Sequence, residues 1–305
     1  MSRILRRRKN GKKDLGYAAA IFGGICWGFS GCCGQFLFQQ KGGTAEWLVS
    51  LRLLFAGLIL ISLAFLTEGK ACTRVFRNRK DRTGLLIFTF AGILLSQYTY
   101  FAAIQHSNAG TATVLQYLFP IIVLLLVCFD ERRGPDGTES AAMILSLAGT
   151  VVLGTHGDFT SLQISPAALF FGLAAAAAAV FYNMLSGDLI RRYGLFSIAG
   201  FGMLIAGLVM TAAVRPWQCG VQWDAGTVLA LAGVIVVGTA AGFGLYLWGV
   251  SVIGPLKGSL LSSVEPAVAV LLSFFWLKTP FVWIDFLGFG MILGAVLILG
   301  MKNAK

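Results

Sequence analysis

Two stretches of the sequence carry the same stripe of polar side chains ahead of a proline. In each, four residues are spaced at i, i+3, i+4 and i+7, which places them on one face of a helix. The first set is Thr113, Gln116, Tyr117 and Pro120. The second set, 146 residues further on, is Ser259, Ser262, Ser263 and Pro266. Hydroxyl and amide groups hydrogen-bond polar solutes, so both stripes are candidate binding faces.

The two prolines should bend their helices. Each lacks a backbone N–H and clashes with the carbonyl four residues earlier, at Gln116 in one stretch and at Ser262 in the other. In lipid a freed carbonyl has no partner, so these faces should look into protein or a wet cavity. We predict kinks at Pro120 and Pro266, with the polar stripes lining a cavity. The alternative is a packed kink whose carbonyl is satisfied by a neighbouring helix.

A carboxyl group lies beside the second proline. Glu265 falls about eight residues, or roughly 12 Å, into an apolar run, where a charged carboxylate costs a few kcal/mol. It should therefore be protonated, paired or facing water. We predict Glu265 as a coupling residue, because such a group can load and release a proton or hold a substrate amine. The alternative role is a structural carboxylate that braces the kink.

Further polar or aromatic side chains interrupt the apolar runs. Arg52 either snorkels outward or contacts an anion or carboxylate. Tyrosines near span ends usually anchor at the membrane interface, but Gln97 and Tyr100 share a deeper helix face. Trp27 is a candidate to pack against the substrate, and its alternative role is packing in the helical core. With the two stripes, the predicted substrate-binding residues are Trp27, Arg52, Gln97, Tyr100, Gln116, Tyr117, Asn183, Tyr246, Ser262 and Ser263.

The sequence lacks the motifs of metal and nucleotide chemistry. His106 and His156 are the only histidines, which excludes an H-E-x-x-H metal site, and no G-x-x-x-x-G-K-[ST] phosphate loop occurs. The six cysteines include no C-x-x-C spacing and are interpreted as small packing residues. We predict no metal, no cofactor, no catalytic residue and no enzymatic activity.

Membrane-spanning helices must position these groups. Hydrophobic residues make up 57% of the 305 residues, charged residues only 12%, and the mean hydropathy is +0.80. Since about 20 apolar residues cross the hydrocarbon core, we predict an all-α integral membrane protein with ten transmembrane helices. The first span is too long for a signal peptide and should remain uncleaved. The predicted spans are 16–38, 47–66, 84–104, 109–129, 139–155, 165–186, 196–214, 226–249, 257–277 and 282–301.

The basic residues predict the orientation. Seven lie before the first span and six between the second and third, whereas the segments assigned to the outside hold only Lys41, Arg215 and Lys278. Because cytoplasmic loops are enriched in Lys and Arg, both termini should be cytoplasmic in a multi-pass protein of the plasma or inner membrane. The net charge of +11 gathers in the tail and loops, which argues against nucleic-acid binding.

The chain also repeats itself. A shift of 146 residues brings Gly92 onto Gly238 and Tyr100 onto Tyr246, and a shift of 150 brings 54–58 onto 204–208 in all but one position. We therefore predict two repeats, over 16–155 and 165–301. Each holds five spans, an odd number, so the second must insert upside down relative to the first. Inverted repeats with a binding site near the midplane are typical of secondary transporters.

The first repeat resembles a known family. The runs Gln97–Ile104 and Ser107–Tyr117, followed by Pro120, are similar to the first repeat of EamA-type proteins of the drug/metabolite transporter superfamily. The resemblance implies ten helices in two inverted EamA repeats, cytoplasmic termini, and export of metabolites or amino acids.

The second repeat carries a shorter resemblance. Glu265 and Pro266 open the run Glu-Pro-Ala-Val-Ala, which is similar to the family's second repeat, and Trp27 and Arg52 stand where the family has them. One departure is at 277–279, which reads Leu-Lys-Thr where the family often has a Glu. The family is broad in substrate, so the resemblance does not choose one.

These features predict a multi-pass membrane transporter, a secondary-active exporter of small metabolites or amino acids, with the bilayer and a small-molecule substrate as its partners. One alternative is a channel-like facilitator of small solutes, which would need no coupling carboxylate. Another is a membrane-embedded enzyme, against which the lack of facing acids or histidines argues. Substrate identity, transport direction, coupling ion and oligomeric state are left open by these residues.

Overall fold

Helices account for the regular structure of the described residues. The computed structural model describes residues 2–156, 164–253, 258 and 261–302, and no strand occurs among them. Seven helices in these ranges are long and apolar enough to cross a membrane. Shorter apolar helices lie at Pro166–Tyr182, Val264–Phe275 and Trp283–Leu299. The predicted all-α membrane class is confirmed.

The helices of the first half fall on the apolar runs. They are α1 (Ser2–Lys41), α2 (Ala45–Glu68), η1 (Gly69–Phe76), α3 (Arg79–Ile87), η2 (Phe88–Leu94), α4 (Leu95–His106), α5 (Ala109–Gln116), α6 (Phe119–Asp130) and α7 (Gly137–Thr155). Of these, η1 is a 3-10 helix. The segment η2 is a π-helix that joins α3 and α4 into one span.

The second half is built in the same way. Its helices are α8 (Pro166–Tyr193), α9 (Leu195–Val214), η3 (Pro216–Gln218), α10 (Ala225–Ala232), η4 (Gly233–Ala241), α11 (Gly242–Ile253), α13 (Val264–Phe275) and α14 (Trp283–Lys302). Here a second π-helix, η4, joins α10 to α11. Ser259, from the second polar stripe, lies outside the described residues.

Short polar side chains fix where several helices begin. Thr44 caps α2 and Asn108 caps α5, each accepting a hydrogen bond from the backbone N–H three residues on. Asp136 and Glu139 form a reciprocal capping box at the start of α7. These side chains satisfy N–H groups that have no partner within the helix, so the short loops hold the spans in a defined register.

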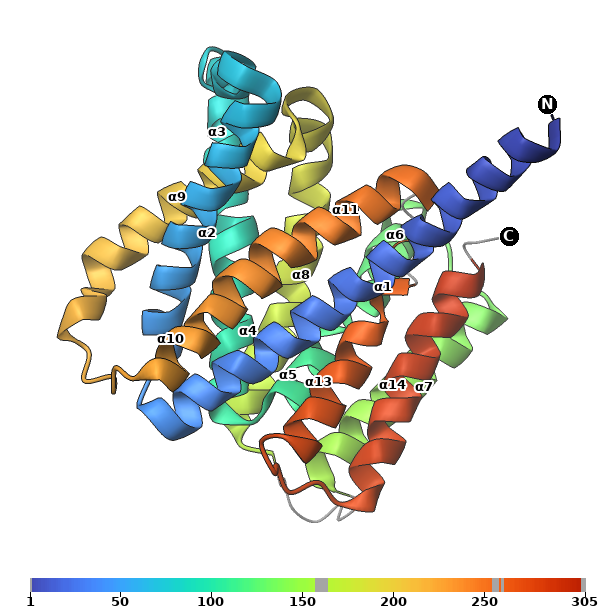
Figure 1. Ribbon diagram of the computed structural model, residues 1–305. Coiled ribbons are helices and arrows are strands. Elements are labelled where there is room, and N and C mark those ends of the chain that lie inside the picture. The colour runs from blue at the N-terminus through green and yellow to red at the C-terminus, as the bar shows by residue number, and fades with distance from the viewer. Residues whose placement is uncertain (1, 157–163, 254–257, 259–260, 303–305) are drawn as a thin grey trace.

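Helices from the two halves of the chain are interleaved. In Figure 1, α1 runs alongside α11, and α14 alongside α7. Helix α2 packs on α9, α4 packs on α8, and α5 meets α13. The buried core therefore includes surfaces between the halves, while large apolar side chains remain exposed, among them Phe22, Phe129, Ile144 and Phe170. Extensive exposed apolar surface marks contact with membrane.

The crossing of α2 and α9 brings two backbones together. A Cβ atom at Gly57 would fall on the backbone of Leu204, and one at Gly207 on the backbone of Leu54. The contacts are reciprocal, since the 150-residue shift brings Leu54 onto Leu204 and Gly57 onto Gly207. Glycine permits this approach because a side chain at either position would push the helices apart.

Candidate functional site

Both proline-containing helices are interrupted just ahead of the proline. In the first, α5 ends at Gln116 and α6 begins at Phe119. In the second, Ser263 interrupts the helix, and α13 begins one residue later. The 146-residue shift brings Tyr117 onto Ser263, so the two breaks occupy corresponding positions. Each break follows from the missing N–H and the bulk of the proline ring.

The two breaks meet through one side chain. The Oη of Tyr117 lies 3.0 Å from Oε2 of Glu265 and 3.3 Å from the carbonyl oxygen of Ser262, and its hydroxyl can donate to either. The Ser262 carbonyl is the one that Pro266 deprives of a backbone partner. A residue of the first polar stripe therefore supplies the hydrogen bond that the second stripe lacks.

Helix α1 lies directly against this crossing. A Cβ at Gly24 would come within 2.7 Å of the carbonyl oxygen of Ser262, and one at Gly28 within 2.7 Å of that of Glu265. Both glycines therefore let α1 approach the backbone of the broken helix. Further along α1, Gly31 leaves room for the hydroxyl of Tyr100.

Aromatic side chains gather beside the crossing. Trp27 of α1 packs against Phe243 and Tyr246 of α11, with ring centroids 5.3 and 5.0 Å away. The hydroxyl of Tyr100 is 2.8 Å from that of Thr113, which belongs to the first polar stripe. The predicted residues Trp27, Tyr100 and Tyr246 are thus brought near the breaks by α1, α4 and α11.

The polar groups at the crossing differ in exposure. Tyr117 and Ser262 are buried, whereas Gln116, Ser263 and Glu265 are partly exposed. A carboxyl group this deep in a span needs a route to water in order to exchange its proton.

Arg52 and Gln97 hold unpartnered polar atoms. Arg52 is only 5% exposed, so it does not snorkel to the membrane surface, and its Cζ lies 5.0 Å from the ring centroid of Phe101. Among the described residues, its Nε has no hydrogen-bond partner, and neither has Oε1 of Gln97, one turn before Phe101 on α4. The side chain of Asn183, another predicted site residue, lies outside the described part.

Gln35 is a central residue that the sequence reasoning missed. It is fully buried in α1, and its Nε2 donates to Oγ1 of Thr279 at 2.8 Å. Its Oε1 accepts hydrogen bonds from the backbone N–H of Ala109 at 2.8 Å and from the hydroxyl of Ser273 at 3.1 Å. One amide therefore ties α1 to the start of α5 and the end of α13. The available signal was a polar side chain inside an apolar run.

Two ion pairs link the halves at the ends of the spans. Arg192 pairs with Asp81 at 2.7 Å, and the hydroxyl of Tyr193 donates to the same carboxylate at 2.6 Å. Lys41 pairs with Asp224 at 2.6 Å. The Lys41 ammonium, helped by a backbone N–H, lowers the pKa of Asp224 to about 2, so this pair stays ionised at neutral pH.

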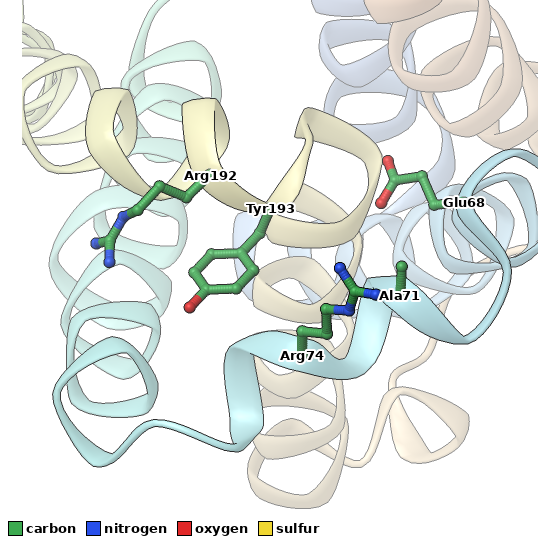
Figure 2. A pocket seen from close by; sticks show the side chains of 5 residues that line it. All are labelled: Glu68, Ala71, Arg74, Arg192 and Tyr193. Atoms are coloured by element: carbon green, nitrogen blue, oxygen red, sulfur yellow. The ribbon is translucent and has the colours of Figure 1, made fainter.

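A pocket of about 370 Å³ opens beside the first ion pair (Figure 2). Its lining residues come from the end of α2, from η1 and from the end of α8; they are Glu68, Ala71, Arg74, Arg192 and Tyr193. These residues lie at the ends of two spans and in the connecting η1, and none belongs to the crossing of the broken helices. The pocket is therefore separate from the candidate site at Tyr117 and Glu265.

The crossing can bind and release a proton and can hydrogen-bond a small solute. Its functional groups are a carboxyl, phenols, hydroxyls and amides, which suit recognition of polar molecules. In the described ranges, no group of three His, Cys, Asp or Glu residues is placed to hold a metal ion, and the cysteines are free.

Comparison with known proteins identifies the family. Residues 14–155 and 166–301 match the EamA-like transporter family. The chain is 37% identical over 295 residues to the inner membrane transporter YicL of Salmonella typhimurium, covering 97% of this chain and 98% of that protein. It is 29% identical over 197 residues to the aromatic amino acid exporter YddG of Ancylobacter novellus, covering 59% of this chain and 63% of that protein. A solved structure with 17% identity and a TM-score of 0.60 covers 97% of this chain and 99% of its own, which shows a shared fold.

The apolar helices and these matches support one assignment. The family is one of transporters, and the relatives carry names of transporters rather than of enzymes. The family membership indicated by the runs at 97–120 and at Glu265 is confirmed. The chain is a multi-pass membrane transporter that belongs to the EamA-like transporter family.

Proposed function

We propose that this transporter is a secondary-active exporter of small metabolites or amino acids, with its site at the crossing of the two broken helices. The hydrogen bond from Tyr117 to Glu265 carries the proposal, because it joins a carboxyl group deep in one half to the polar stripe of the other. Aromatic residues beside the crossing, and the substrate named for the YddG relative, support an amino acid or another amphipathic metabolite.

We infer further that ten transmembrane helices form two inverted repeats, over 16–155 and 165–301. The reciprocal contacts of Gly57 with Leu204 and of Gly207 with Leu54 are those expected around a two-fold axis relating the copies. The π-helices η2 and η4 also correspond under the 146-residue shift.

The links between the halves support the same symmetry. If the two repeats are exchanged, the contact between α1 and α11 corresponds to the contact between α8 and α4. The ion pairs Arg192–Asp81 and Lys41–Asp224 correspond in the same way. Each joins the end of the first span of one repeat to the start of the third span of the other repeat. Such repeats provide alternating access, because one half can rock against the other around a fixed site.

The proposed site uses groups from both copies. Glu265 couples transport to a proton, and Pro120 and Pro266 keep the helices open at the breaks. The π-helices η2 and η4 offer further bending points in the adjacent spans. The residues proposed to contact substrate are Trp27, Arg52, Gln97, Tyr100, Gln116, Tyr117, Asn183, Tyr246, Ser262 and Ser263.

The orientation gives a first prediction. A reporter fused after Lys305 and another inserted near Arg77 should both be cytoplasmic, because the basic segments are retained on that side. A reporter inserted at Gly220, between η3 and α10, should be external. Protease protection or paired fluorescent and phosphatase reporters would check this. Finding Lys305 and Arg77 on opposite sides would contradict the inverted-repeat arrangement.

Counterflow tests transport itself. Liposomes that contain the purified protein and excess unlabelled phenylalanine should take up external radiolabelled phenylalanine faster than unloaded liposomes do. A carrier behaves this way because its occupied site reorients in both directions. A channel-like facilitator would give no stimulation by internal substrate. Uptake equal to that of protein-free liposomes across a panel of amino acids and aromatic acids would contradict the proposal.

A further inference from the structure

We infer that Arg52 is a carboxylate subsite, and that the substrates are small amphipathic molecules with a carboxylate beside an apolar or aromatic body. This inference rests on the proposed function, because it names the substrate class of that transporter. Its observational basis is a buried cation that forms no ion pair with any of the described residues.

The guanidinium of Arg52 has no ion-pair partner among the described residues. Its side chain is only 5% exposed, yet none of the ion pairs among the described residues includes it. Its Nε is also without a hydrogen-bond partner in this part of the chain. The ring of Phe101 covers the cation at 5.0 Å, but an aromatic face offsets only part of the cost of desolvation. A carboxylate would complete the site through two parallel N–H···O bonds.

Glu265 does not occupy this role. The charges of Arg52 and Glu265 are close enough to interact, but the two residues form no ion pair in the described part of the chain, and Oε2 of Glu265 accepts from Tyr117. The guanidinium is thus left without a bidentate partner although a carboxyl group lies near it. A ligand there can direct its carboxylate to Arg52 and, where it has one, an ammonium group toward Glu265.

The surroundings favour an organic anion over a small inorganic one. Phe101 packs against Tyr100 with ring centroids 5.2 Å apart, and the hydroxyl of Tyr100 fits against Gly31 of α1. Trp27 lies one turn before Gly31 on the same helix face, so aromatic rings continue from Arg52 toward α1. Oε1 of Gln97, one turn before Phe101, is an unpartnered acceptor for a ligand donor. These groups match an apolar body that carries polar substituents at one end.

Binding measurements on the full-length purified protein test the subsite without a gradient. The probes are 3-phenylpropanoate, its uncharged analogue 3-phenylpropanamide, and phenylalanine, titrated by calorimetry. The carboxylate should bind at least about tenfold more tightly than the amide, because a hydrogen-bonded charge pair is stronger than a neutral one. Phenylalanine should bind at least as well as 3-phenylpropanoate if its ammonium is accepted near Glu265.

Variants assign the preference to Arg52. Arg52→Gln should bring the carboxylate and amide affinities within about twofold of each other, whereas Arg52→Lys should retain part of the difference. Arg82→Gln, the same change at an exposed arginine, should leave the ratio unchanged. If Arg52→Gln fails to fold, Arg52→Lys decides the matter, because it keeps the charge but loses the paired N–H donors and should lower the preference for the carboxylate.

Four results would overturn the inference. Three of them are equal affinity for the two probes, absence of carboxylate binding at millimolar concentration, and a preference that survives in folded Arg52→Gln. Competition by chloride or phosphate as strong as that by 3-phenylpropanoate would also overturn it in favour of an inorganic-anion site. Arg52-dependent binding without counterflow would leave the subsite standing and reject the transport proposal. Counterflow without carboxylate preference would reject the subsite and leave the transport proposal standing.

Discussion

Replacing Glu265 with Gln should abolish substrate accumulation driven by a proton gradient while preserving exchange of substrate for substrate. The amide keeps the size of the side chain, and its oxygen can still accept the hydrogen bond from Tyr117 that now measures 3.0 Å. The amide cannot bind and release a proton, so a proton gradient can no longer drive transport. Gradient-driven uptake should fall to the level of protein-free liposomes.

Both transport modes should be measured on the same preparation of liposomes, corrected for the amount of protein. Glu46→Gln is a matched control, because Glu46 accepts a tyrosine hydrogen bond, from Tyr98 at 2.9 Å, but sits at the start of α2. If Glu265 is instead a structural brace, its Gln variant should express poorly, and exchange and accumulation should fall together. Unchanged accumulation in the variant would reject the coupling role.

The membrane class and the positions of the helices could be predicted because they depend on local composition. An apolar run long enough to cross the bilayer must form a helix, since no other conformation of a single segment satisfies its backbone in lipid. The proline positions likewise indicated where a helix must break. These features need no knowledge of which helices become neighbours.

The partners across the site could not be predicted in this way. The polar stripe containing Tyr117 showed which face was polar, but not that its hydroxyl would reach Ser262 and Glu265 on another helix. Gln35 was overlooked for the same reason, because its role exists only where α1 meets α5 and α13. The π-helices were also unforeseen, since one extra residue in a helical turn leaves no mark on an almost uniformly apolar run.

The sequence repeat, by contrast, leads to a sharp prediction about packing. Gly57→Ala and Gly207→Ala should each destabilise the protein by about 1–3 kcal/mol, because the new methyl group meets the backbone of the opposing helix. Alanine is the better helix former, so the loss would come from the crossing of α2 and α9 alone. Gly290→Ala is the control: it makes the same change on α14, where a Cβ has no atom within 4 Å.

The two variants should also behave alike, because their contacts with Leu204 and Leu54 are reciprocal. The double variant should cost less than the sum of the single changes, since either methyl group already separates the two helices and relieves the other clash. Thermal unfolding in detergent would give the stability of all four variants. It can be monitored as the loss of the monodisperse peak in size-exclusion chromatography. If Gly57→Ala or Gly207→Ala melted at the temperature of Gly290→Ala, the two backbones would not be in contact, and the two-fold relation between α2 and α9 would lose its support.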